Sequence, residues 1–409
     1  MATILDFKGK KARRRPRIGL ALAGGGPLGA VYEIGALAAI EESIEGLDLN
    51  NADIYVGVSA GGIVASALAN GITPHQMCRI FIESDTPESD TPYFFKPELL
   101  MKPAWREFGT RLKMIPGLFA SSLYRYVRRA GKAGILESFE RMKEALPTGI
   151  LSNDGIDEFL RATFSIGMRT NDFRHLPHKL IVVATDLDSG TSVNFGAPGW
   201  DHVPISVAVQ ASASVPGLFP PVEIAGRQFV DGALHKTMHA SIALAEDIDV
   251  LFCVNPIVPY SSGNMHGQGR LAAGGLVNVV SQTLRSILHS RLEAGMVNYD
   301  AMYPDTEILL FQPSKEDSEM FLTNIFSYSN RRRMCESAYQ NTRMMLWERR
   351  DEIGPKLAAH GLRLKLPVLQ DVSLSLVKKP PTEKNHHFSV TALNDVLDDL
   401  ARYLKVANG

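Results

Sequence analysis

The stretch that most constrains the fold is residues 53–70, DIYVGVSAGGIVASALAN, which reads as a short apolar strand, a tight turn and a helix. Gly57, Ser59 and Gly61 form the pattern G-x-S-x-G. In a nucleophile elbow this pattern lifts a serine hydroxyl out of the backbone at the end of a strand. Glycine tolerates the unusual backbone angles of such a turn. The motif therefore predicts Ser59 as a nucleophile, while a plain turn of small residues is the alternative.

Strand and helix patterns alternate along much of the chain. Buried strands are expected at 17–23, 180–184, 228–230, 250–255 and 307–311, helices at 31–45, 271–298 and 330–352, and a glycine-rich loop at 24–29. Alternation of this kind is typical of a mostly parallel sheet with helices on its faces, so the sequence predicts an α/β fold.

The overall composition argues against several classes of protein. The 409 residues carry a net charge of −1, which gives no argument for a nucleic-acid partner. The three cysteines lie far apart, which suits a reducing compartment and shows no metal-ligand spacing. No run of about 18 apolar residues is present, so no membrane span is expected. We therefore predict a cytoplasmic protein without metal or cofactor.

Two basic segments suggest contact with a membrane surface. Residues 1–16 form a basic tail, expected to be solvated, with attraction to anionic lipids as the alternative. Residues 72–150 are interrupted by prolines and are expected to form a cap over the site. Within them, residues 102–132 combine many cations with interleaved aromatics. This part is predicted to touch the inner membrane surface, unless its aromatic side chains pack on the core instead.

Two further motifs extend the serine motif. Gly24 to Gly29, GGGPLG, matches G-x-G-x-x-G, but a nucleotide site would also need an acid at the end of the second strand, where Ser59 stands. Bare amides at Gly25 and Gly26 suit an oxyanion hole better. Asp231-Gly232-Ala233 follows a short strand and offers a base, because burial beside the serine would make this carboxylate more basic.

These motifs, with ASASVPGLFPPV at 211–222, resemble the patatin-like phospholipase family over residues 17–255. The resemblance implies a three-layer α/β/α fold and hydrolysis of acyl esters of lipids. It implies a dyad with Ser59 as nucleophile and Asp231 as base, and an oxyanion hole lined by Gly24, Gly25 and Gly26. Many members carry arginine or lysine where this chain has Leu28. This difference weakens the expectation of a phospholipid substrate more than the expectation of a lipid ester in general.

Beyond residue 255 the predictions concern organisation. Residues 256–377 are expected to continue the core with a helical extension, 378–388 to form a linker, and 389–409 to form an amphipathic helix for docking or homo-oligomerisation. Two alternative functions stay open. One is an α/β-hydrolase with a Ser-His-Asp triad, and the other is a non-catalytic, membrane-associated scaffold on the same fold.

Overall fold

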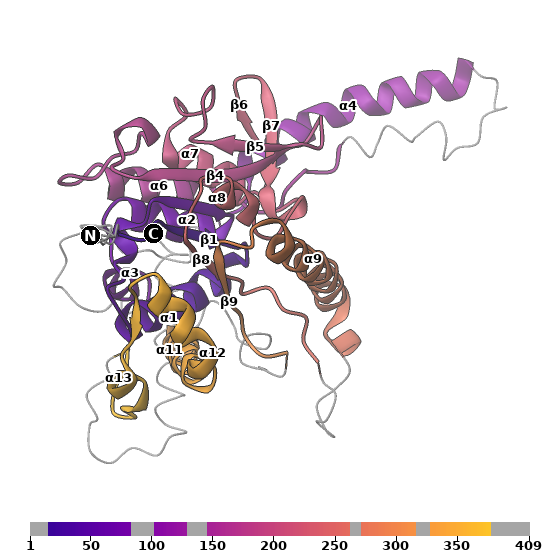
Figure 1. Cartoon of the computed structure of the whole chain (residues 1–409). Coiled ribbons are helices and arrows are strands. Elements are labelled where there is room, and N and C mark those ends of the chain that lie inside the picture. The colour runs from indigo at the N-terminus through magenta and orange to yellow at the C-terminus, as the bar shows by residue number, and fades with distance from the viewer. Residues whose placement is uncertain (1–14, 83–101, 129–144, 262–270, 316–327, 378–409) are drawn as a thin grey trace, which may run out of the picture.

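The computed structural model describes residues 15–82, 102–128, 145–261, 271–315 and 328–377 (Figure 1). The predicted linker 378–388, the predicted helix 389–409 with its oligomer contact, and residues 1–14 of the basic tail lie outside these ranges. The domain boundaries given above stay predictions.

An eight-stranded sheet forms the centre of the protein, in the order β6-β7-β4-β3-β1-β8-β9 with β5 also paired to β4. The parallel strands are β1 (Ile18–Leu22), β3 (Ile54–Val58), β4 (Lys179–Asp186), β8 (Val250–Val254) and β9 (Glu307–Phe311). The antiparallel ones are β5 (Ser192–Phe195), β6 (Val222–Ile224) and β7 (Arg227–Asp231). The expected strands and the α/β class are confirmed.

Helices cover both faces of this sheet, which gives the expected three layers. The larger core packs under α1 (Gly26–Ser43), α2 (Ala60–Ala69), α3 (Pro74–Phe81), α6 (Asp154–Phe164), α7 (Ile205–Ser212) and α11 (Tyr328–Glu348). The second core packs under α8 (Ala240–Leu244) and α9 (Gly275–Met302). Successive strand residues point to opposite faces, so Leu20 and Leu22 enter the first core and Ala21 the second.

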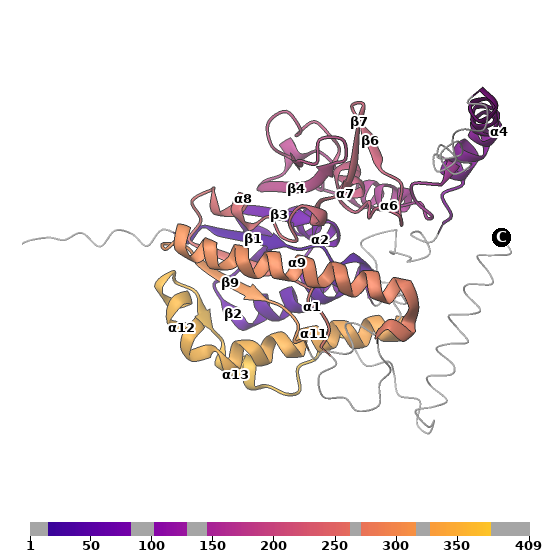
Figure 2. The same ribbon diagram turned by 90° about the vertical axis from the view of Figure 1, so that its right-hand side faces the viewer.

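The C-terminal part of the described chain joins the first layer. Helix α11 packs along α1, and the two lie side by side in Figure 1 and Figure 2. It is followed by α12 (Arg350–Ala359) and α13 (Leu366–Gln370). Between these two helices, β10 (Arg363–Leu364) pairs with β2 (Ile44–Glu45) in a separate two-stranded sheet. Residues 328–377 therefore extend the core that carries the elbow.

The glycine-rich segment differs from its prediction. The expected loop over 24–29 is wrong for residues 26–29, because α1 already begins at Gly26 rather than at Val31. Pro27 lies in the first turn of the helix, where a missing N–H costs nothing, and Gly26 adopts a φ of 61° at the turn into the helix. The loop is therefore very short, and it ends at a helix N-terminus.

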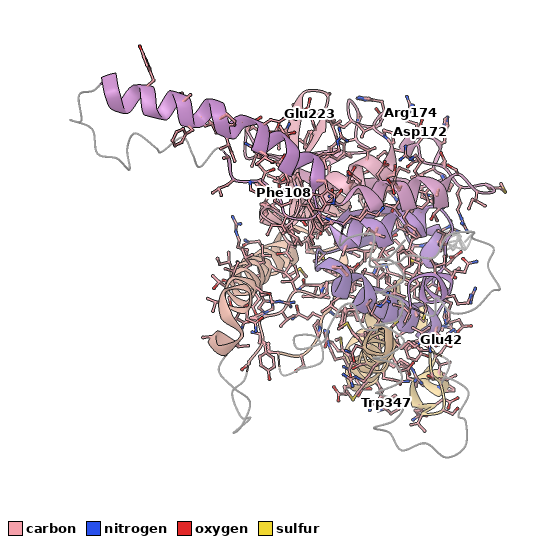
Figure 3. The ribbon with its side chains drawn as sticks, turned by 180° about the vertical axis from the view of Figure 1, so that it is seen from behind. Glu42, Phe108, Asp172, Arg174, Glu223 and Trp347 are labelled. Carbon is pink, nitrogen blue, oxygen red and sulfur yellow. The ribbon has the colours of Figure 1, made fainter. Side chains whose placement is uncertain are left out.

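The segment expected as a cap has two described parts of different character. Its first part contains α3, whose Met77 and Cys78 are buried in the first core. Its second part is α4 (Trp105–Arg128), which projects from the body, with Phe108 near the point where the helix leaves it (Figure 3). Residues 83–101 and 129–144 of the segment lie outside the described ranges.

Candidate active site

Ser59 occupies a strained position between β3 and α2. Its φ of 54° and ψ of −123° are unusual for a residue with a side chain. The flanking glycines are required sterically. A Cβ on Gly57 would lie 2.5 Å from the carbonyl oxygen of Gly61, and one on Gly61 would lie 2.5 Å from that of Leu22. The turn therefore has the backbone that the G-x-S-x-G pattern predicts.

A buried serine on α7 supports this strained turn. The Ser59 N–H donates to Ser212 Oγ at 2.8 Å, and the Ser212 hydroxyl donates to the Val183 carbonyl of β4 at 2.6 Å. Ser212 lies in the run of small residues at 211–214, but nothing in the sequence assigned it a role. Its contact depends on the packing of α7 against the end of β3, so only the fold reveals it.

Asp231 reaches Ser59 through the pairing of the strands. On one edge of β4, Val183 pairs with Val58, the last residue of β3, and the next residue, Ala184, pairs with Asp231, the last residue of β7. Strand β5 occupies the opposite edge of β4. Strands β3 and β7 therefore end beside each other on the same edge, and the residue after Val58 is Ser59.

The glycine after Asp231 permits this close approach. A Cβ on Gly232 would lie 2.2 Å from the carbonyl oxygen of Val183 and 3.1 Å from a methyl group of Val58. A side chain at this position would push the end of β7 away from β3. The D-G pair in the sequence is thus explained by the packing of the two strand ends.

Burial controls the charge of Asp231. The side chain is 4% exposed, and burial raises the pKa of its carboxyl to about 6. Hydrogen bonds from the Ser59 side chain and from the Ala233 N–H, the latter at 2.8 Å, lower that pKa in part. At neutral pH the group is mainly a carboxylate, and it is more basic than an aspartate in water. It can therefore accept a proton from the serine hydroxyl.

The three glycines of the loop have different surroundings. The Gly24 N–H donates to the Thr237 carbonyl at 3.3 Å. A Cβ on Gly24 would lie 3.0 Å from Ala233 Cβ and 3.2 Å from Ser59 Cβ, so the absence of a side chain at Gly24 lets the serine and the aspartate segments lie close together. Gly25 is confined by Pro256, whose Cγ would lie 2.6 Å from an added Cβ.

Gly26 is the glycine of these three that lines the apolar pocket. It lines the pocket next to Ser59 and opens α1, where the first amides have no partner within the helix and the helix dipole favours negative charge. The Gly24 amide is already bonded. Gly25 and Gly26 are therefore the members of the predicted Gly24–Gly26 set whose amides suit an oxyanion.

Two histidines lie near Asp231 in the sequence, but neither hydrogen-bonds the side chain of Ser59 or Asp231 in the described geometry. The rings of His235 and His239 stack with centroids 6.3 Å apart. His239 is buried, which lowers its pKa to about 4, and it hydrogen-bonds the backbone of Gly232. Among the described residues, no histidine lines the pocket at Ser59 or appears among the hydrogen-bond partners of Asp231. The described geometry gives no support to the triad alternative.

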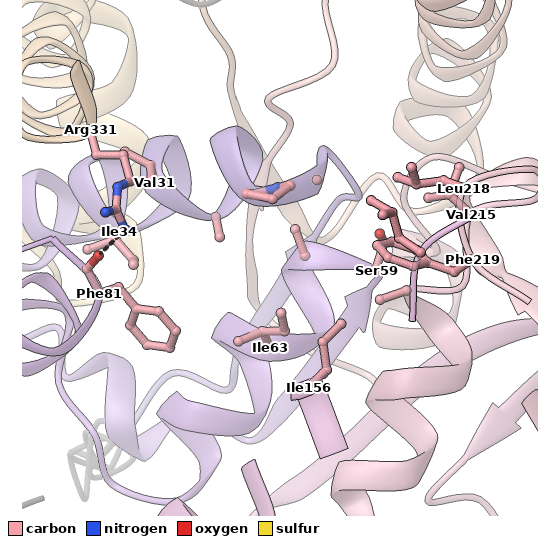
Figure 4. Close-up of a pocket in the computed structure, with 16 residues that line it drawn as sticks. Val31, Ile34, Ser59, Ile63, Phe81, Ile156, Val215, Leu218, Phe219 and Arg331 are labelled. Carbon is pink, nitrogen blue, oxygen red and sulfur yellow. Dashed lines mark hydrogen bonds between the residues drawn. The ribbon is translucent and has the colours of Figure 1, made fainter. Parts of the chain in front are cut away.

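An apolar pocket of about 220 Å³ opens from Ser59 (Figure 4). Ser59 lies at one end with Leu218 and Phe219, and Phe81 and Arg331 lie at the other. The remaining lining residues are Gly26, Pro27, Ala30, Val31, Ile34, Ala60, Ile63, Leu151, Ile156, Ala213 and Val215. An apolar pocket that begins at a serine hydroxyl suits a hydrocarbon chain.

The three layers and the G-x-S-x-G turn define an α/β protein with a serine at a strand-to-helix elbow. Within that class the chain belongs to the patatin-like phospholipase family, whose sequence model matches residues 20–244, more than half of the chain. This is a family of lipid acyl hydrolases, and the family expectation is confirmed.

Solved structures also resemble this chain. VipD from Legionella pneumophila has 16% identity and a TM-score of 0.36, with 82% of this chain and 67% of that chain covered. Full-length ExoU from Pseudomonas aeruginosa, in complex with SpcU, has 15% identity and a TM-score of 0.25, with 70% and 53% covered. This chain thus spans about half the length of that ExoU chain. No curated protein sequence matches it.

The described ranges lack a metal-binding cluster and a helix that could span a membrane. They contain no group of three or more histidine, cysteine, aspartate or glutamate side chains arranged to hold a metal ion. Each helix in the same ranges is too short or too polar for a transmembrane segment.

Proposed function

We propose that the protein is a serine acyl hydrolase that cleaves acyl esters of lipids, of the phospholipase A, lysophospholipase or lipid esterase type. Ser59 is the nucleophile and Asp231 the base. The observation that supports this most strongly is the contact between the Ser59 side chain and the buried Asp231 carboxyl at the mouth of an apolar pocket. No cofactor is required by this chemistry.

In the acylation step Ser59 Oγ attacks the ester carbonyl and its proton passes to Asp231. The amides of Gly25 and Gly26 donate to the oxyanion of the tetrahedral intermediate. The intermediate collapses, the bond to the alcohol breaks, and Asp231 returns the proton to the leaving alcohol. Water then attacks the acyl-enzyme, Asp231 takes a proton from it, and the free acid leaves as Ser59 recovers its hydrogen.

The pocket supports a lipid acyl group as the substrate element bound beside Ser59. Leu28, at the position where many family members carry a cation, packs against the apolar core. This arrangement favours recognition through the acyl chain over recognition through a phosphate at position 28.

A fluorophosphonate probe and a medium-chain p-nitrophenyl ester test the proposal together. We expect the probe to label the peptide that contains Ser59, and we expect Ser59→Ala to abolish both labelling and ester turnover while the circular dichroism spectrum is retained. A folded wild-type protein that neither reacts with the probe nor hydrolyses esters would contradict the proposal and favour the scaffold function.

We also propose that α4 makes a peripheral contact with a membrane, at its inner surface if the protein is cytoplasmic. Trp105, Phe108, Leu112, Ile115 and Phe119 recur at helical spacing on one side of α4. Trp105 is 74%, Leu112 68% and Phe119 50% exposed. A helix with exposed apolar groups on one face and cations beside them is typical of helices that lie in a membrane interface.

Vesicle sedimentation tests this contact independently of catalysis. Binding to vesicles with anionic lipid is expected to fall with added salt, because the cations of α4 are screened. The double variant Trp105→Ala/Leu112→Ala should bind the vesicles more weakly than wild type at the same salt concentration. The contact would be refuted if this double variant sedimented like wild type.

A further inference from the structure

The far end of the apolar pocket is closed by a charged side chain. Arg331 of α11 is 3% exposed and donates from Nη1 to the Phe81 carbonyl at 3.3 Å (Figure 4). Among the described residues that line the pocket, Ser59 and Arg331 are the polar side chains, and they lie at opposite ends. An acyl chain attached at Ser59 would therefore run along apolar walls until it met a guanidinium.

The pocket has a length that can be compared with an acyl chain. The stretch of α1 from Gly26 to Ile34 lines it, and at about 1.5 Å of rise per residue this stretch is about 12 Å long. A fully extended chain advances about 1.2 Å per covalent bond, so roughly ten bonds fit between the two ends. The distance from Ser59 to Arg331 thus corresponds to a medium-length acyl group.

We propose that Arg331, bonded to the backbone of Phe81, limits the length of the acyl group and makes the enzyme selective for medium-chain acyl esters. Each added methylene gains from burial in the apolar pocket until the chain reaches Arg331. A longer chain would press hydrocarbon against a buried guanidinium and displace its polar contacts, which is unfavourable. This inference rests on the proposed function and assigns Arg331 as a specificity-determining residue.

A chain-length profile tests the assignment. We would measure kcat/KM for p-nitrophenyl acetate, butyrate, octanoate, decanoate and palmitate with wild type, Arg331→Met and Arg333→Met. Arg333 lies on the same helix and is exposed, so Arg333→Met is the matched control. Wild type and this control should peak at octanoate or decanoate, and Arg331→Met should raise the palmitate-to-octanoate ratio about tenfold. Acetate is too short to reach Arg331, so acetate turnover is the reference against which each longer ester is compared.

A second variant keeps the test informative if Arg331→Met does not fold. Phe81→Ala lengthens the same end of the pocket without removing the charge, and it should also raise the palmitate-to-octanoate ratio. An unchanged profile in a folded Arg331→Met, or an equal loss for every ester including acetate, would overturn the length limit. Failure of wild type to hydrolyse any ester would instead count against the proposed function.

Discussion

The Ser59 side chain hydrogen-bonds the Asp231 carboxyl because β3 and β7 end beside each other on one edge of β4. Val183 pairs with the end of β3, and its neighbour Ala184 pairs with the end of β7. The position of both groups is therefore set by the register of the central sheet and not by a surface loop. Sites built on strand ends hold their geometry more accurately than sites on loops.

Gly24→Ala tests whether the loop must pass between the serine and the aspartate segments. The new methyl group would lie 3.0 Å from Ala233 Cβ and 3.2 Å from Ser59 Cβ, so the two segments must separate by a few tenths of an ångström. Because small misplacements of reacting groups are costly, we expect kcat/KM for an octanoate ester to fall about tenfold to a hundredfold. Gly109→Ala on α4, where an added Cβ meets open space, is the control, and full activity of Gly24→Ala would refute this role.

The pH dependence of catalysis follows from the raised pKa of Asp231, which is about 6. The base must be deprotonated, so kcat/KM should decrease about tenfold per pH unit below pH ~6 and level off above it. A stopped assay of a neutral ester between pH 4.5 and 8 measures this limb. A profile that is flat across that range would contradict the prediction, because it would show that no group in the free enzyme with this pKa controls kcat/KM.

The free energy of unfolding should also depend on the protonation of Asp231. The folded-state pKa of Asp231 lies above its unfolded value of about 3.9, so the folded state binds the proton more tightly. The contribution to stability is present below pH ~4 and is lost as the pH rises through ~6. We therefore expect Asp231→Asn to gain stability relative to wild type with rising pH, by on the order of 2 kcal/mol at pH 7.

Urea unfolding of both proteins at several pH values measures this difference. Comparing wild type with Asp231→Asn at each pH cancels the contributions of the other titrating groups to stability. These groups include Glu33, whose carboxyl pKa is also raised by burial. A difference that shrinks as the pH rises would contradict the assignment of the buried charge to Asp231.

Ser212→Ala tests the support of the elbow. The variant leaves the buried Ser59 N–H without its acceptor, which costs about 1–3 kcal/mol of stability and loosens the strained turn. We expect a loss of ester turnover of about tenfold or more, beyond any loss of folded protein. Thermal unfolding and kcat/KM should be measured together.

Ser206→Ala provides the matched control for this experiment. Ser206 is also buried on α7, but its hydroxyl donates to Asp157 at 2.6 Å, away from the elbow. This variant should lose stability with little loss of turnover per folded molecule. If Ser206→Ala and Ser212→Ala affected turnover equally, the effect would belong to α7 as a whole.

Most of the candidate site can be predicted from local sequence motifs. Ser59 and its glycines lie within one turn, and Asp231 with Gly232 forms a recognisable pair at a strand end, so neighbouring residues are enough to predict them as candidates. The sequence predicts the wrong start for α1, because GGGP is typical of loops, although proline suits the first helical turn. The supporting residue Ser212 lies 153 positions from its partner, and Arg331 lies 250 positions from Phe81. Only the packing of α7 and α11 brings these residues to the pocket and the elbow, so no local pattern could reveal them.

A double-mutant comparison of Ser59 and Asp231 tests the central claim most directly. We would measure kcat/KM for an octanoate ester with wild type, Ser59→Ala, Asp231→Asn and the double variant, each verified as folded. If the two groups act as one unit, each single change should lower kcat/KM by about 10⁴ or more, and the double variant should fall no further. Turnover of Asp231→Asn close to that of wild type, at a pH above 7, would contradict the account.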